Sequence, residues 1–521
     1  MRIRELCSTL GFSRLTCENE MMITSARMAA VDRNAEALGI SPQQLMESGG
    51  NAVAQTVRSL VDIDSESQAT PVVAIVAGRG NNGGDGFVAA RFLDEYTVSV
   101  SLLGRPETIR TATAKQNWEA VTTSGYDTTV VRDASAIEIA GPDGEQPDLI
   151  VDAMLGTGVT GALREPEATA ARQVNNTDAP VLSVDVPSGV DADTGSSTDV
   201  SVDADHVVTF HDQKPGLETI DADVTVADIG IPRAAEQIAG PGDLQLLSRP
   251  TQSHKGDFGE VLVVGGGPYT GAPALTAQAA LRAGADLVRV ACPVAIADEI
   301  QNCEESLIIK SYPGERLTPT ALDHVQSLAA NHDVTVLGPG LGDNEKTLSV
   351  VASFLRAHTG KVVVDADALS VVPSVDPTGE IICTPHQGEL AAMGGETADD
   401  WERRVEKIAA FISELDETHT LLVKGAIDII SNGETTRINQ TGNPGMTVGG
   451  TGDVLAGAVG ALACVLDPIQ AATVGAYANG RAGDIVVEKR GNGLLATDLL
   501  DILPTALQDP KDMTTKASSN D

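Results

Sequence analysis

Aromatic and basic residues are scarce in this chain. Aromatic side chains make up 3% of its 521 residues, and 35 lysines and arginines face 73 aspartates and glutamates, for a formal net charge of −38. Such an acidic chain repels the phosphates of nucleic acids and the surfaces of anionic membranes, and no cluster of basic residues offsets this repulsion. We therefore expect neither a nucleic-acid partner nor a membrane partner.

Paired cysteines and long apolar runs are absent. None of the six cysteines forms a CxxC pair, so the sequence predicts neither a zinc site nor a disulfide framework and favours a cytoplasmic location. The longest nearly polar-free run, 454–466, is too short to span a bilayer and predicts a buried helix. Residues 1–12 lack the apolar stretch of a secretory signal.

The acidic excess itself points to a salty cytosol. At about 1 M salt the Debye length is only about 3 Å, so a dense acidic surface no longer repels itself. We therefore expect a halophilic and haloarchaeal source, against the simpler alternative of an acidic protein from an ordinary cytosol.

Apolar, strand-like runs alternate with helical patterns along most of the chain. This alternation is typical of parallel sheets covered by helices on both faces, and it predicts an α/β fold with two doubly wound domains. The Pro- and Gly-rich stretch 232–252 separates two such series. We expect an extension at 1–21, a first domain at 22–247, a second at 248–508 and a polar tail at 509–521.

Three glycine-rich or polar turns follow strand-like runs in the first half. The turn at 78–86 has five glycines in nine residues, and Asp152 and Asp185 end two later runs. Glycines let a backbone approach a phosphate, and oxygen ligands such as Asn82, Asp152 and Ser188 suit a monovalent or divalent cation. Alternatively, Asp152 and Asp185 only cap their turns.

The motifs GRGNNGGDGFVAARFL, VDAMLGTGVTG, SVDVPSGVDADTG and Lys214-Pro215-Gly216 resemble the NAD(P)H-hydrate epimerase domain over residues 22–240. The resemblance implies a Rossmann-like three-layer sandwich, with Asp185 as the catalytic carboxylate. It also implies a potassium ion held by Asn82, Asp152 and Ser188. The substrate contacts that it implies are Asn81, Asn82, Gly83, Gly84, Asp85, Gly156, Thr157, Gly158, Val159, Thr160, Gly161, Ala162 and Asp185.

The sharpest motif of the second half is NPGMTVGGTGD, which precedes the apolar run 454–466. A glycine-rich loop that leads into a helix presents backbone amides to an anion, and Asp453 in the first turn can face a substrate hydroxyl. Alternatively, Asp453 only complements the helix dipole. Other polar turns follow strand-like runs at 338–342, 365–369, 384–389 and 424–428. His386 in one of them is by itself more typical of a solvated or capping residue.

Together these motifs resemble the ribokinase-like superfamily, and within it the ADP/ATP-dependent NAD(P)H-hydrate dehydratase, over residues 250–505. The resemblance implies that Asp453 is the catalytic base and that magnesium and ADP are cofactors. Val448 departs from the small residue expected beside the loop. The implied hydrate contacts are Ala272, Gly340, His386 and Asp453, and the implied nucleotide contacts are Lys424, Gly425, Ala426, Ile427, Asp428 and Gly452.

The two resemblances predict a fused repair enzyme. Its first half would interconvert the R and S hydrates of NADH and NADPH, and its second half would dehydrate the S form while ADP is converted to AMP and phosphate. The alternative is a ribokinase-like small-molecule kinase with a non-catalytic binding domain at its N-terminus. Since proteins of this fold often assemble through exposed helices, we also expect a homo-oligomer.

Overall fold

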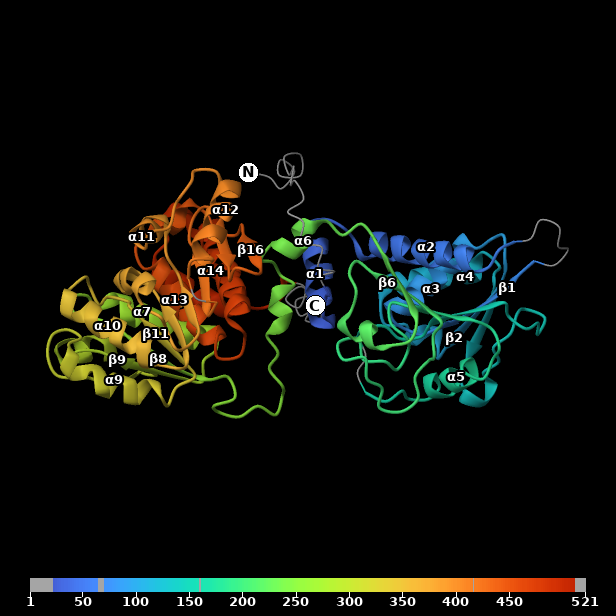
Figure 1. The fold of residues 1–521 in the computed structure, drawn as a ribbon, viewed down its shortest axis with the longest axis horizontal. Helices are drawn as coiled ribbons and strands as arrows, with labels where there is room; N and C mark the ends of the chain where they lie inside the picture. The colour runs from blue at the N-terminus through green and yellow to red at the C-terminus, as the bar shows by residue number, and fades with distance from the viewer. Residues whose placement is uncertain (1–21, 64–69, 159–160, 416, 511–521) are drawn as a thin grey trace. The chain divides into compact units, whose positions relative to one another are not determined.

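The computed structural model describes residues 22–63, 70–158, 161–415 and 417–510, and the chain divides into two compact units between Ala235 and Glu236. The extension expected at 1–21 and most of the expected polar tail lie outside the described residues. Each unit has its own sheet and its own hydrophobic core (Figure 1). In the described part of the chain, no helix has both the length and the apolar content needed to cross a lipid bilayer.

The division between the units comes earlier in the chain than the expected boundary near residue 248. Ala239 and Leu244 are buried in the core of the second unit. Arg437 of that unit donates to both carboxyl oxygens of Asp243, at 2.7 and 2.8 Å, and both side chains are buried. A stretch rich in Pro and Gly is thus anchored by contacts that its composition does not reveal.

One fully parallel sheet forms the first unit. Its strands are β1 (Val72–Ala77), β2 (Thr97–Leu103), β3 (Asp127–Val131), β4 (Leu149–Ala153), β5 (Val181–Val184), β6 (His206–Phe210) and β7 (Asp223–Ala227). They lie in the order β3-β2-β1-β4-β5-β6-β7. The chain changes direction across the sheet between β1 and β4, and ligands of such sheets bind at this point, beyond the carboxyl ends of the strands.

Helices cover both faces of this sheet. The helices α1 (Ser25–Ala37), α2 (Pro42–Leu60), α3 (Asn81–Phe92) and α4 (Ala112–Thr123) share a core with Val73 and Ile75 of β1. Helix α5 (Glu167–Val174) packs with Val76 and Ile150 on the opposite face (Figure 1). Successive side chains of a strand point to opposite faces of the sheet. Because helices cover both faces here, the side chains on both faces must be apolar. The expected Rossmann-like three-layer sandwich is confirmed.

A larger sheet forms the second unit. Its strands are β8 (Glu260–Val264), β9 (Leu287–Ala291), β10 (Ile308–Ile309), β11 (Val334–Leu337), β12 (Lys361–Val364), β13 (Ile381–Cys383), β14 (His419–Val423), β15 (Asp428–Ser431) and β16 (Thr436–Asn439). They lie in the order β10-β9-β8-β11-β12-β13-β14-β15-β16. The pairs from β10 to β14 are parallel, whereas β15 and β16 add an antiparallel edge.

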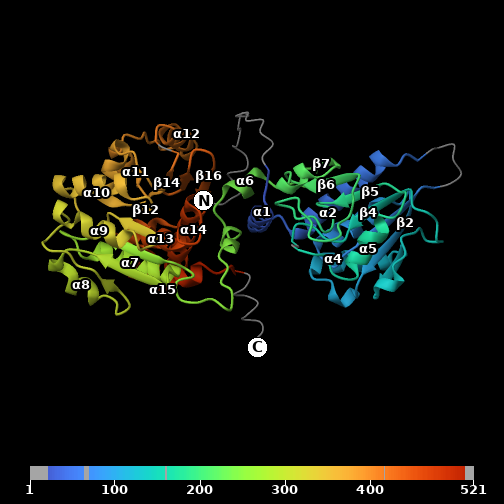
Figure 2. The ribbon, with the colours of Figure 1, turned by 60° about the horizontal axis from the view of Figure 1, so that its bottom comes forward.

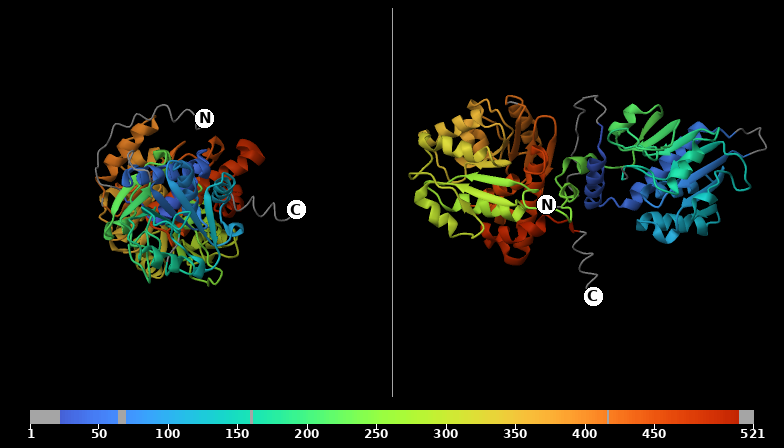
Figure 3. Two further views of the ribbon diagram at one scale, coloured as in Figure 1. Left: turned by 90° about the vertical axis from the view of Figure 1, so that its right-hand side faces the viewer. Right: turned by 90° about the horizontal axis from the view of Figure 1, so that it is seen from below.

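This sheet also lies between two helical layers (Figure 2, Figure 3). The helices α7 (Gly271–Ala283), α8 (Ala297–Gln301), α13 (Thr451–Leu462) and α14 (Pro468–Arg490) pack on one face, and α15 (Ala496–Ala506) packs against α7 and α14. The helices α9 (Leu322–Ala329), α10 (Glu345–Ala357), α11 (Gln387–Ala392) and α12 (Trp401–Ile412) pack on the other. The short helix α6 (Arg233–Gln237) spans the division between the units. Both units are doubly wound, as predicted.

Candidate active sites in the two halves

The glycine-rich turn of the first unit joins β1 to α3 at the strand-order reversal. A Cβ atom at Gly78 would lie 1.8 Å from the carbonyl oxygen of Met154, and one at Gly83 would lie 2.1 Å from the carbonyl oxygen of Gly78. Only glycine therefore permits this close approach of the turn to the end of β4. Helix α3 begins at Asn81, which is exposed; Asn82 in its first turn and Asp85 after that turn are buried.

Asp152, at the end of β4, is fully buried and accepts hydrogen bonds on both carboxyl oxygens. The Ser188 hydroxyl donates to Oδ1 at 2.7 Å, and the Ser188 amide and the Ser183 hydroxyl each donate to Oδ2 at 2.9 Å. Burial raises the pKa of Asp152, and these hydrogen bonds oppose that rise. The structure thus joins two of the three predicted cation ligands.

Asn82, the third predicted cation ligand, has a buried Nδ2 atom without a hydrogen-bond partner among the described residues. A Cβ atom at Gly156 would lie 3.2 Å from Asn82 Oδ1 and 3.3 Å from Asp185 Oδ2, so this glycine faces both side chains. Hard oxygen atoms of an amide, a carboxylate and a hydroxyl are a donor set that suits an alkali or alkaline-earth cation. The residues therefore fit the predicted potassium ion.

Asp185 follows β5 in a left-handed backbone conformation, with φ +67°, which is uncommon for a residue other than glycine. The Lys214 ammonium lies 2.8 Å from Asp185 Oδ1 and also donates to Thr209 Oγ1 at 2.9 Å and the Phe210 carbonyl at 2.8 Å. Lys214 has no exposed surface, so all of its hydrogen bonds are made within the protein. The motif Lys214-Pro215-Gly216 by itself assigns no role to this lysine.

The remaining predicted substrate contacts of the first unit differ in burial. Gly83, Gly84 and Asp85 are buried, and burial, followed by the nearby Asp185 carboxylate, raises the pKa of Asp85 well above its usual value. The loop after β4 is more open: Gly156 and Thr157 are half-buried, whereas Gly158, Gly161 and Ala162 are exposed. Val159 and Thr160 lie outside the described residues.

In the second unit, Asp453 lies in the first turn of α13, as predicted, and the helix is preceded by Gly450 with φ +98°. The pKa of Asp453 is raised to about 7, first by burial and then by the carboxylates of Asp365 and Glu389, whereas Lys424 opposes this rise. Lys424 Nζ lies 3.0 Å from Asp365 Oδ1 and 3.7 Å from Glu389 Oε2. These side chains form one cluster of charges at the carboxyl ends of the strands.

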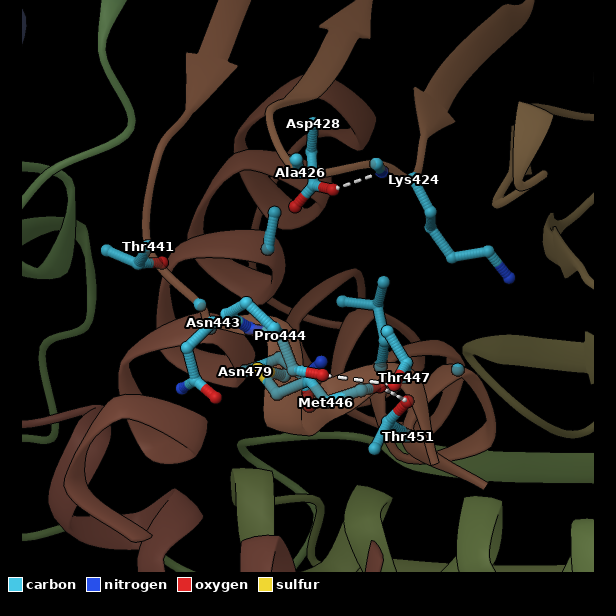
Figure 4. A pocket seen from close by; sticks show the side chains of 16 residues that line it. Lys424, Ala426, Asp428, Thr441, Asn443, Pro444, Met446, Thr447, Thr451 and Asn479 are labelled. Atoms are coloured by element: carbon cyan, nitrogen blue, oxygen red, sulfur yellow. Dashed lines mark hydrogen bonds between the residues drawn. The ribbon is translucent and has the colours of Figure 1, made fainter. Parts of the chain in front are cut away.

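A cavity of about 410 Å³ opens beside this cluster (Figure 4). It lies between the loop after β14, the loop before α13 and one side of α14. A Cβ atom at Gly452 would lie 3.3 Å from Lys424 Nζ, so the start of α13 and the lysine meet at the wall of the cavity. The predicted nucleotide contacts that line it are Lys424, Gly425, Ala426, Asp428 and Gly452; Ile427 does not.

The predicted hydrate contacts lie at other strand ends. His386 caps α11: its Nδ1 accepts from the Glu389 amide at 3.0 Å, and its side chain is 60% exposed. In this structure, His386 therefore makes the contacts of a helix-capping residue. A Cβ atom at Gly340 would lie 3.1 Å from Pro273, the residue after Ala272, so the structure brings these two predicted contact regions together.

Two family models match the chain. The model described as NAD(P)H-hydrate dehydratase matches residues 261–505, and that described as YjeF-related protein N-terminus matches residues 42–216. Among curated proteins, the bifunctional NAD(P)H-hydrate repair enzyme of Archaeoglobus fulgidus is 42% identical over 93% of this chain and 98% of its own. The enzyme of the same name from Methanothermobacter thermautotrophicus is 41% identical over 95% of this chain and 96% of its own.

Among solved structures, the chain is similar to an ADP/ATP-dependent NAD(P)H-hydrate dehydratase from Bacillus subtilis, co-crystallized with ATP and Mg²⁺. The two are 24% identical, with a TM-score of 0.45, over 52% of this chain and 97% of that one.

Proposed function

Because this chain belongs to the family of bifunctional NAD(P)H-hydrate repair enzymes, we propose that its two halves catalyse consecutive steps of one repair. The first half interconverts the R and S hydrates of NADH and NADPH, and the second half dehydrates the S form. The observation that carries this proposal is the placement of Asp453 in the first turn of α13, directly after Gly452, which lines a cavity of about 410 Å³ together with Lys424. That volume lies in the range of small-molecule sites.

Dehydration needs a leaving group better than hydroxide. Asp453 takes the proton of the ring hydroxyl while that oxygen attacks the terminal phosphorus of ADP, and AMP is released. The ring nitrogen then expels the phosphate from the neighbouring carbon, and loss of a proton from the adjacent CH₂ restores the dihydropyridine. A base with a pKa of about 7 is suited to the first step near neutral pH.

Backbone amides at the start of α13 and the Lys424 ammonium supply the positive field for the phosphoryl group. Magnesium, when bound, offsets further negative charge on the phosphates. The carboxylates of Asp365 and Glu389, both within 4 Å of Lys424 Nζ, are hard oxygen donors of the kind that magnesium takes. They are therefore our candidates for holding the ion.

Epimerisation at the hydroxyl-bearing ring carbon requires proton transfer to and from that hydroxyl. Asp185 accepts the hydroxyl proton, the bond from this carbon to the ring nitrogen opens with protonation of the nitrogen, and the ring closes on the other face. Lys214 at 2.8 Å stabilises the negative charge of Asp185. Potassium at Asn82, Asp152 and Ser188 would contribute positive charge that helps to bind the substrate phosphates.

The test is to incubate the full chain with mixed R and S hydrates of NADH, ADP and magnesium near neutral pH. We expect all of the hydrate to return to NADH, seen as recovery of the reduced-nicotinamide absorbance, with one AMP and one phosphate formed for each NADH. A phosphorylated product that persists would instead support the alternative of a small-molecule kinase. Recovery that stops when the S hydrate is used up would remove the epimerase function.

A further inference from the structure

Most polar side chains that line the cavity of the second half are already hydrogen-bonded within the protein. The Asp428 carboxylate accepts from the Gly425 amide and from Asn439 Nδ2, each at 2.9 Å. The hydroxyls of Thr441, Thr447 and Thr451 donate to protein oxygens at 2.8, 3.0 and 2.9 Å, and Asn443 Nδ2 donates to Asp484 at 2.9 Å. These side chains shape the cavity, but most of their hydrogen-bonding groups are already paired within the protein and are not available to a ligand.

Asn479, on α14, differs from them. It lines the cavity and is 6% exposed, yet its Oδ1 atom has no hydrogen-bond partner among the described residues. Native proteins seldom leave a buried amide unpaired, because its hydrogen bonds to water are lost without replacement. A Cβ atom at the next residue, Gly480, would lie 2.6 Å from the carbonyl oxygen of Thr441, so the helix is pressed against the loop and Asn479 is held in place.

The position of Asn479 indicates which part of a ligand it meets. Lys424 stands next to Gly452 and Asp453, where the phosphates must lie for the reaction proposed above. Figure 4 draws Asn479 near Met446 and away from Lys424, and a Cβ atom at Gly442 would lie 3.3 Å from Met446 Sδ and 3.6 Å from the Cα atom of Gly480, the residue after Asn479. The end of a nucleotide opposite its phosphates is the base.

We propose that Asn479 recognises the adenine base of ADP and sets the preference for adenine over guanine nucleotides. A carboxamide has one acceptor and one donor side by side, and this pair matches the exocyclic amine and the neighbouring ring nitrogen of adenine. Guanine presents two acceptors, or two donors, on the corresponding edges. The inference rests on the proposed dehydratase function and deepens it.

The test compares Asn479→Leu and Asn479→Asp with the wild-type full chain, using ADP and GDP as phosphoryl donors for the S hydrate. We expect the wild type to prefer ADP at least roughly 10-fold in kcat/KM, and the Leu variant to lose roughly 10- to 100-fold with ADP but little with GDP. The Asp variant moves the ratio toward GDP, because a carboxylate accepts from the N1–H and amine of guanine and repels the ring nitrogen of adenine.

Thr473→Val is the matched control, since Thr473 is buried on the same helix, donates to the Ile469 carbonyl at 2.7 Å and does not line the cavity. It should keep the wild-type ADP:GDP ratio. A wild type that uses both nucleotides equally, or an unchanged ratio in the Asp variant, overturns the role of Asn479 and leaves the dehydratase function intact. A wild type that dehydrates with neither nucleotide overturns the proposed function itself. If Asn479→Leu melts at a lower temperature than Thr473→Val, the Asp variant alone decides.

Discussion

Asp453 has the position and the pKa of a general base. Its carboxyl lies at the start of α13, and its pKa is raised to about 7, first by burial and then by Asp365 and Glu389. We predict that Asp453→Asn slows dehydration of the S hydrate by roughly 10²- to 10⁴-fold while ADP affinity changes little. In the wild type, kcat should rise with pH through about 7, because only the deprotonated carboxylate accepts a proton. Turnover by the Asn variant at the wild-type rate would rule out this role.

The carboxyl group of Asp453 should also lower the stability of the folded chain. Its pKa is about 7 in the folded chain and near the ordinary 3.8 when unfolded, so the folded state binds more protons between these values. Stability therefore falls as pH rises from about 4 to about 7, and the penalty is complete above pH 7. We predict that Asp453→Asn raises the melting temperature of the second half at pH 8 and changes it little at pH 4. An equal shift at both pH values would contradict the pKa.

A corresponding prediction for the first half concerns Asp185, its proposed catalytic carboxylate. Asp185→Asn should slow epimerisation by roughly 10²-fold or more, because an amide cannot accept the hydroxyl proton and no longer pairs with Lys214. Dehydration of pure S hydrate should continue at the wild-type rate, since Asp185 and Asp453 belong to different compact units. With mixed hydrates, NADH recovery should stop after the S fraction. Asp453→Asn is the reciprocal control and should retain epimerisation.

At the scale of elements, α13 packs closely against α7. A Cβ atom at Gly457, in the middle of α13, would lie 2.0 Å from the carbonyl oxygen of Thr276, so α13 is held against α7 by a contact that only glycine permits. We predict that Gly457→Ala lowers the free energy of unfolding of this half by about 1–3 kcal/mol or more. Dehydration should weaken as Asp453 moves. Gly493→Ala, whose Cβ meets nothing within 4 Å, is the control for thermal denaturation.

The strands that the sequence predicts best are short, mostly apolar runs with turns after them. The mostly apolar runs 72–77, 149–153, 181–184, 206–210, 287–291 and 334–337 predict strands, and the strands β1, β4, β5, β6, β9 and β11 have the same bounds. Strand β3 (Asp127–Val131) was not predicted, since it lies at an edge and alternates exposed polar positions. Helix α14 was also not predicted, because it is rich in Ala and Gly and its buried residues surround much of its length.

Site residues could be predicted where they lie in local sequence motifs. They could not be predicted where their role depends on tertiary contacts. The turn at 78–86 and the loop before Asp453 have characteristic sequences that lead into helix N-termini. Lys214 and Asn479 lack such a signal. The first matters because folding brings it to Asp185, and the second because folding leaves its amide unpaired. Neither relation can be deduced from spacing along the chain.

For the molecule as a whole, the net charge of −38 should govern the response to salt. At low ionic strength the acidic groups repel one another over about 10 Å or more, and at about 1 M salt over only about 3 Å. We therefore predict that the melting temperature rises steadily as KCl increases from low to molar concentration. A flat or falling melting temperature would refute adaptation to a salty cytosol.

Sodium separates this general screening from the proposed potassium site. Screening depends on ionic strength alone, so NaCl should raise the melting temperature of both halves as KCl does at equal molar concentration. A site formed by Asn82, Asp152 and Ser188 should instead saturate at low salt, and only in the first half. Epimerisation should therefore be faster in dilute KCl than in NaCl of the same concentration. Equal rates in the two salts, with the expected rise in melting temperature, would retain the screening and remove the selective potassium site.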